Sequence, residues 1–147
     1  VERGIDVTVT VSFDGIGEVH DFVRWPIKWD KFYSNLMKYK AMGISNLNLW
    51  TTVNALNVGD FANIIDFKNE HKIDHSWALL NQPEMLDIRY ENWLTLVAKE
   101  KLAQSRNQEV LPLLEQIASL ENNTVHLLEF IKQQDELRNI SYKDYYQ

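Results

Sequence analysis

The 147-residue sequence contains no cysteine, and this absence excludes more than any other. Without thiolates the chain can form neither a disulfide nor a thiolate-held zinc or iron–sulfur site. Basic residues are also in deficit, since 15 Lys and Arg stand against 21 Asp and Glu for a formal net charge of −6. That charge argues against nucleic-acid and anionic-membrane partners. No apolar run reaches the ~18 residues of a transmembrane helix, so we expect a cytoplasmic protein.

The chain does contain enough apolar material for a core. Hydrophobic residues make up 45% of the sequence and aromatic residues 12%, which is typical of a folded domain. The length fits a single globular unit.

Three segments show the alternation of β-strands. In residues 5–12, valine and isoleucine alternate with aspartate, threonine and serine, which predicts a strand with one polar face. Residues 46–54 and 73–81 are predicted as the second and third strands. Helices are predicted between the strands over residues 28–42 and 61–72, the second capped by Asp60. This order predicts right-handed βαβ units and a parallel sheet.

The polar faces of the strands indicate the architecture. Parallel strands covered on both faces read as unbroken apolar runs, whereas here Thr, Ser, Asn and His alternate with apolar residues. We therefore expect an α/β fold of partial (β/α) barrel type, with three or more parallel strands, outer helices and a polar lumen. Trp50 and Trp77 are both assigned to the lumen face, where they would form an exposed apolar patch. This patch and an open edge at residues 5–12 predict a homo-oligomer or a missing N-terminal half.

The chain after Pro83 is predicted to be helical. A helix over residues 91–103 would bury a stripe of Trp93, Leu94, Val97 and Leu102. Residues 108–120 and 124–139 are predicted as an αα-hairpin, broken at residues 121–123, with Thr124 as N-cap. A tail with Tyr142, Tyr145 and Tyr146 is expected to dock on the domain or to lie at a contact. Residues 1–90 would thus form the half-barrel and residues 91–147 a helical extension packed on it.

A motif with defined spacing follows the first strand. The run S-F-D-G contains Ser12 and Asp14, His20 and Asp21 come next, and Arg24 lies twelve positions after Ser12. This spacing resembles the fourth strand and following loop of radical S-adenosylmethionine enzymes, above all those with SPASM or twitch C-terminal domains. The resemblance covers about residues 5–90, strands four to six of that barrel, and includes the run P-E-M-L-D-I-R at residues 83–89.

The resemblance implies S-adenosylmethionine as the ligand. Ser12 and Arg24 would hold its carboxylate, since a guanidinium forks onto a carboxylate. Asn57 would shape the pocket, and the end of the third strand would meet the adenine. The residues implied in ligand binding are Ser12, Asp14, Arg24, Asn54, Asn57, Leu79 and Asn81. A purely structural interpretation stays open, in which Asp14, Glu18 or Asp21 pairs with Arg24 and Asn57 builds a turn.

The absence of cysteine restricts the function that the resemblance can imply. Such enzymes hold a 4Fe-4S cluster on cysteine thiolates, so the cluster is not possible in this chain alone, and no catalytic residue is assigned. One hypothesis is a C-terminal fragment or truncated derivative of such an enzyme, which contributes ligand and substrate contacts. The alternatives are a cluster-free module that binds a small ligand or a protein, and an interaction module built on the C-terminal helices. A C-x-x-x-C-x-x-C segment encoded upstream would favour the first.

Two further patterns carry no prediction of a site. His71 and His75 are four residues apart, but a strand is expected to begin between them and no third ligand is placed by spacing, so no metal is predicted. Gly15 and Gly17 do not make a dinucleotide fingerprint, because His20 occupies the third glycine position and no helix is expected to follow.

Overall fold

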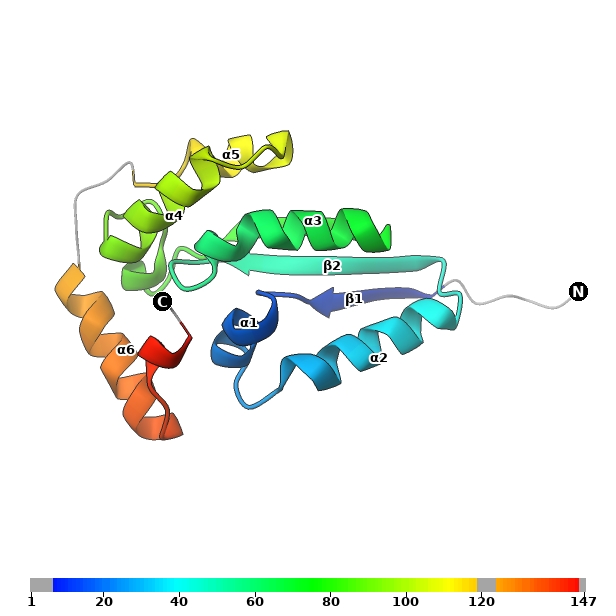
Figure 1. Ribbon diagram of the computed structural model, residues 1–147, viewed down its shortest axis with the longest axis horizontal. Coiled ribbons are helices and arrows are strands. Elements are labelled where there is room, and N and C mark those ends of the chain that lie inside the picture. Colours follow the sequence, from blue (N-terminus) through cyan, green and yellow to red (C-terminus); the bar gives the residue numbers. More distant parts are fainter. Residues whose placement is uncertain (1–6, 119–123, 146–147) are drawn as a thin grey trace, which may run out of the picture.

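A computed structural model describes residues 7–118 and 124–145. At its centre is a parallel sheet in the order β1-β2-β3, formed by β1 (Thr8–Ser12), β2 (Asn46–Val53) and β3 (Asp74–Leu79). Two crossover helices, α2 (Trp29–Ala41) and α3 (Phe61–His71), connect the strands (Figure 1). The mixed α/β class and the three parallel strands that the alternation predicts are confirmed.

Shorter elements and the C-terminal helices surround the carboxyl ends of the strands (Figure 1). The helices are α1 (Gly17–Val23), α4 (Trp93–Ala103), α5 (Leu111–Leu114) and α6 (Thr124–Arg138). Single 3-10 turns are η1 (Val58–Asp60), η2 (Glu84–Leu86), η3 (Gln108–Val110) and η4 (Tyr142–Asp144). Among the described residues, none of the helices combines the length and apolar character needed to cross a membrane.

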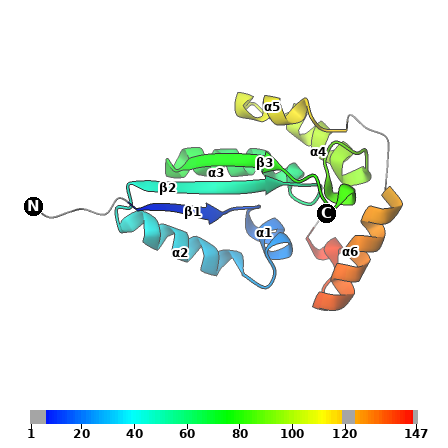
Figure 2. The ribbon, with the colours of Figure 1, turned by 180° about the vertical axis from the view of Figure 1, so that it is seen from behind.

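The two faces of the sheet differ in what covers them. One face, here called the covered face, packs on α2 and α3 and consists of Val9, Val11, Leu47, Leu49, Thr51, Val53, His75, Trp77 and Leu79. The opposite face, here called the open face, consists of Thr8, Thr10, Ser12, Asn46, Asn48, Trp50, Thr52, Asp74, Ser76 and Ala78. No side chain of the open face is buried. In Figure 2, seen from behind, β3 lies in front of α3.

Handedness explains why both crossover helices share a face. Each β-helix-β connection is right-handed as a rule, and the strands succeed one another in the same direction across the sheet. The core follows from this arrangement. Phe13, Leu36, Leu49, Ile64 and Phe67 form one buried cluster between the sheet and the two helices.

The C-terminal helices extend this core. Val53 and Phe61 share a second buried cluster with Ala98 of α4 and Leu113 of α5. A third cluster seats α6 through Leu127. The docking predicted for the aromatic tail is confirmed for Tyr142, which packs on the third cluster, and for Tyr145, whose ring lies 5.3 Å from that of Phe22. Tyr146 lies outside the described residues.

The predicted Trp50–Trp77 patch is wrong. In the register of β2 and β3, Trp50 is opposite Ser76 and Thr51 is opposite Trp77. Trp77 therefore lies on the covered face, where its ring is 5.6 Å from that of Phe61. The alternation of β3 predicts the wrong face for Trp77, because a shift of one position exchanges the two faces of a strand.

The interpretation of the Gly15–Gly17 loop also needs correction. A seven-residue helix, α1, begins at Gly17, where none was predicted. It is too short to be stable alone and is held by tertiary packing of its buried residues His20 and Phe22.

The predicted αα-hairpin is wrong as well. Leu113 of α5 belongs to the cluster around Val53, whereas Leu127 of α6 belongs to the cluster around Leu86. The two helices therefore pack on different parts of the molecule (Figure 1). The break predicted at residues 121–123 lies outside the described residues.

Three local predictions differ from the structure. Val97 is 59% exposed and does not belong to the buried stripe of α4. Asp60 occupies the N-cap position of α3 without capping it, because its carboxylate accepts hydrogen bonds from Ile16 N at 2.7 Å and from Asn63 Nδ2 at 2.6 Å. β3 ends at Leu79, so Asn81 lies beyond the strand.

Candidate functional site

Asp14 is the best-connected member of the S-F-D-G motif. The residue as a whole is 7% exposed. Its Oδ1 accepts a hydrogen bond from Thr52 N at 2.9 Å, and its Oδ2 lies 3.3 Å from Arg24 Nη1. Burial raises the pKa of this carboxyl, while the bond from Thr52 and the Arg24 charge oppose the increase. Asp14 thus ties the loop after β1 to β2, and it is one of the three partners that the structural interpretation offered for Arg24.

Ser12 and Arg24 lie along one hollow of about 360 Å³ beside the edge of β1. Ser12 ends β1 on the open face, and Arg24 is the C-cap residue of α1. The Arg24 side chain is 37% exposed, so its guanidinium reaches solvent as well as Asp14. The structure therefore brings together the two residues to which the resemblance assigns the carboxylate of S-adenosylmethionine.

His20 forms part of the wall of the same hollow. It is fully buried, and within the described part of the chain neither ring nitrogen has a hydrogen-bond partner of good geometry. The rings of Phe32 and Trp29 lie 4.6 and 5.5 Å away. Burial lowers the pKa of His20, so the ring is neutral and packs as an aromatic residue.

Asn54 and Asn57 build the turn after β2. Asn57 Oδ1 accepts a hydrogen bond from Asn54 N at 2.8 Å, and its Nδ2 donates to the Thr52 carbonyl at 3.0 Å. Asn54 Oδ1 accepts from Leu56 N at 2.9 Å. Asn57 is 1% exposed, which leaves its amide no free access to a ligand.

The remaining ligand positions lie apart from this hollow. Leu79 is half-buried against the cluster around Val53, and Asn81 is exposed beyond the end of β3. Asn54 lines a different cavity from Ser12 and Arg24. The predicted residues thus divide into one hollow at the β1 edge and separate positions at the ends of β2 and β3.

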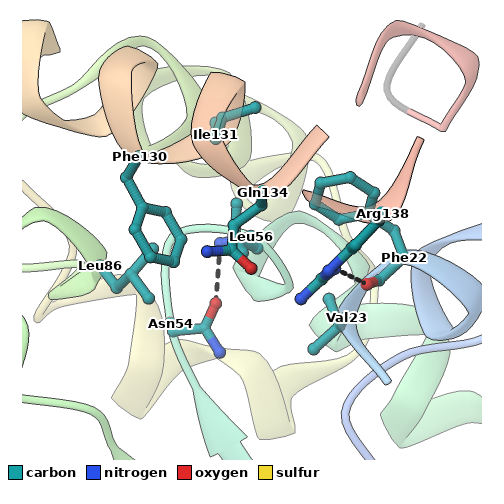
Figure 3. Close-up of a pocket in the computed structure, with 9 residues that line it drawn as sticks. All are labelled: Phe22, Val23, Asn54, Leu56, Leu86, Phe130, Ile131, Gln134 and Arg138. Carbon is teal, nitrogen blue, oxygen red and sulfur yellow. Dashed lines mark hydrogen bonds between the residues drawn. The ribbon is translucent and has the colours of Figure 1, made fainter. Parts of the chain in front are cut away.

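The cavity next to Asn54 has a volume of about 200 Å³ and is here called the α6 pocket. Figure 3 shows Gln134 and Arg138 extending from α6 towards Asn54, with Phe130 beside them. Arg138 Nη1 donates a hydrogen bond to the Phe22 carbonyl at 2.8 Å. Sequence reasoning missed Gln134 and Arg138, because they form an i, i+4 pair on a helix without a recognisable motif.

His75 is linked to the sheet rather than to a metal. Its Nε2 lies 2.9 Å from Thr51 Oγ1, and that hydroxyl donates its own proton to the Phe13 carbonyl. Nε2 must therefore carry the ring proton. Burial lowers the pKa of His75 to about 4, and the Lys68 charge adds to the decrease. Within residues 7–118 and 124–145, no group of three His, Cys, Asp or Glu residues is arranged to hold a metal ion.

Comparison with known proteins adds no relative: no protein-family model, curated protein or solved structure matches this chain.

Proposed function

We propose that this chain forms the C-terminal half of a radical S-adenosylmethionine-type (β/α) barrel, as a fragment or truncated derivative of such an enzyme. In this proposal it contributes ligand and substrate contacts, while an N-terminal half supplies the thiolates that hold the cluster. The chain alone has no radical or redox activity. The proposal rests on the resemblance of the motif around Ser12 and Arg24 together with the form of the sheet.

The open face is the observation that carries this proposal. Parallel sheets are normally covered on both faces, yet Thr10, Asn48 and Ser76 on neighbouring strands all point away from the helices. Polar side chains in a shared register suit a wall around a wet cavity, as in the lumen of a barrel. β1 also lies at the edge of the sheet, where a further strand can pair.

Ser12 and Arg24 would bind the carboxylate of S-adenosylmethionine at this edge. Only Nη1 of Arg24 contacts Asp14, and a guanidinium has five N–H donors, so donors remain for a second carboxylate. Without the cluster iron, the remaining contacts are an exposed charge pair worth about 0–1 kcal/mol and one hydroxyl. We expect a dissociation constant in the millimolar range or weaker, about 4 kcal/mol at best.

The Arg24–Asp14 pair favours a second candidate function. Because Arg24 already has a carboxylate partner, the motif is also suited to holding the loop of a cluster-free module that binds a small ligand or a protein. Calorimetry with S-adenosylmethionine separates the two. Micromolar affinity that is lost in Arg24→Ala would support the cluster-free module, whereas millimolar or weaker binding supports the half-barrel.

The coding sequence gives the simplest test of the half-barrel. We expect a C-x-x-x-C-x-x-C segment upstream in the same or a neighbouring reading frame. Co-production of that segment with this chain should yield a cluster-containing complex. When an external one-electron reductant is added, this complex should cleave S-adenosylmethionine to methionine and a 5′-deoxyadenosyl radical, which is detected as 5′-deoxyadenosine after it abstracts a hydrogen atom from substrate or buffer. If no such segment is encoded there, the half-barrel is contradicted.

Thiol labelling tests whether the open face is covered in the assembled protein. Because the chain has no cysteine, Thr10→Cys and Ser76→Cys each place a single thiol on the open face. Glu70→Cys, at an exposed position of α3, is the matched control. In a homo-oligomer or a complex with the N-terminal half, we expect the first two thiols to react more slowly than the control. Equal rates in the assembled protein would contradict coverage of this face.

A further inference from the structure

The α6 pocket contains a half-buried arginine that has no acidic partner. Arg24 and Arg89 each pair with an aspartate, whereas Arg138 has no carboxylate within ion-pair distance among the described residues. This is unexpected in a chain with a net charge of −6. One N–H of Arg138 is used by the Phe22 carbonyl, and the guanidinium has four more.

The guanidinium is held in place before any ligand binds. Its central carbon lies 5.6 Å from the ring centre of Phe22 and 5.7 Å from that of Trp25, distances suited to cation–π contact. The hydrogen bond to the end of α1 adds a third restraint. An arginine that is already ordered loses less conformational entropy on binding an anion.

The rest of the α6 pocket combines apolar walls with one available amide. Leu56, Leu86 and Phe130 supply the apolar surface. The Asn54 amide is occupied by Leu56 N and the Thr52 carbonyl. Gln134 is half-buried, and its side-chain amide makes no hydrogen bond with any described residue. Figure 3 shows this side chain beside Arg138.

We infer that the α6 pocket binds a small organic carboxylate. The ligand carboxylate accepts two parallel hydrogen bonds from the Arg138 guanidinium. The apolar part of the ligand packs against Leu86 and Phe130, and Gln134 binds a polar substituent. Among the described residues, Arg138 is the only cation that lines the pocket, which favours a planar carboxylate over a more highly charged phosphate. The volume of about 200 Å³ is below the usual ~300–1,000 Å³ of drug-sized sites, so the ligand is small.

The location suggests what this ligand does. Asn54 continues the open-face alternation of β2, so the pocket lies where that strand ends. If the chain is half of a (β/α) barrel, as proposed above, the pocket is a substrate site, because the carboxyl ends of the strands line the active site of such a barrel. This assignment as a substrate site rests on the proposed function. Carboxylate binding itself does not depend on that function.

An NMR titration of the whole chain tests the inference with 3-phenylpropionate as the probe and its neutral amide, 3-phenylpropionamide, as the matched control. We expect saturable shifts of the Arg138 Nε–H, the Gln134 amide and the Trp25 indole with the acid, and at least tenfold weaker binding of the amide. Arg138→Gln should weaken acid binding at least tenfold. Arg106→Gln makes the same charge change at an exposed position and should leave binding unchanged.

Arg138→Lys separates a binding effect from a folding defect, because it keeps the positive charge and removes the bidentate guanidinium geometry. It should bind the acid more weakly than the native chain while retaining the native spectrum of the core. Equal binding of acid and amide, undiminished binding in Arg138→Gln, or no saturable shift at the solubility limit of the probe would each overturn the inference. No S-adenosylmethionine is used, so failure here is distinguishable from failure of the half-barrel.

Discussion

The two faces of the sheet are made by the same strands and have opposite characters. Leu49 and Val53 on the covered face are completely buried, whereas their neighbours Asn48 and Thr52 on the open face are not buried. Stability is thus concentrated on one side of the sheet. The other side can change or bind a partner with little effect on the core.

The two faces also differ in the hydrogen bonds that their polar side chains make. On the covered face, the His75 ring is hydrogen-bonded to the Thr51 hydroxyl, which in turn donates to the Phe13 carbonyl. These groups therefore have the hydrogen-bond partners that buried polar groups require. On the open face, the Ser76 hydroxyl reaches Asn48 Oδ1 only at 3.4 Å. The open face therefore keeps polar groups available for water or for a partner.

Truncation of the covered face should have the largest effect. Leu49 is fully buried between the sheet and its helices, so Leu49→Ala should lower the free energy of unfolding by about 2–5 kcal/mol. Thr10→Ala on the open face should change it by less than about 0.5 kcal/mol. Urea denaturation of both variants measures the difference. Similar losses would show that the open face is buried in the protein as it exists in solution.

The covered face should also make stability sensitive to acid. The unfolded chain protonates His75 near its ordinary pKa of 6.5, while the folded chain resists protonation until about pH 4. Stability is therefore lost as the pH falls through this window, by about 2–3 kcal/mol for a half-buried ring.

The same denaturation series at pH 7, 5.5 and 4 checks the acid sensitivity with two variants. His75→Gln should lose less stability than the native chain over this range. His126→Gln replaces a histidine whose side chain is 59% exposed and should behave as the native chain does. Parallel pH curves for the native chain and His75→Gln would contradict the assignment.

The two tryptophans give the finest comparison of the faces. Trp50 is 38% exposed on the open face, so Trp50→Ser should alter the free energy of unfolding by less than about 1 kcal/mol. Trp77→Ser should cost more, because that ring packs on Phe61. If copies of the chain associate through the open face, light scattering should show weaker association for Trp50→Ser only. Stronger destabilisation by Trp50→Ser would reverse the assignment of faces.

Strong local patterns predicted most of the sheet. The alternation in β2 places Leu47, Leu49 and Val53 together, as the structure does. The alternation in β3 could not show which face of that strand meets the helices, since Trp77 and Ser76 alternate equally well in either register. α1 was missed because its seven residues are stabilised by packing rather than by a local signal.

The candidate site was only partly predictable, because some of its contacts join residues that are far apart in the sequence. Ser12, Asp14 and Arg24 are close in sequence, so their spacing could be read directly. Arg138 reaches the Phe22 carbonyl across 116 residues, and no pattern in the sequence connects the two. Distant pairs of this kind become visible only when the chain is folded.

The contacts of Phe22 also join parts of the chain that are synthesised at different times. Arg138 and Tyr145 both contact this residue, yet they are translated long after the sheet. At about 5–20 residues per second, the sheet and its two helices can form seconds before α6 leaves the ribosome. The α6 pocket therefore forms after the sheet, and a nascent chain has its first core before it has that pocket.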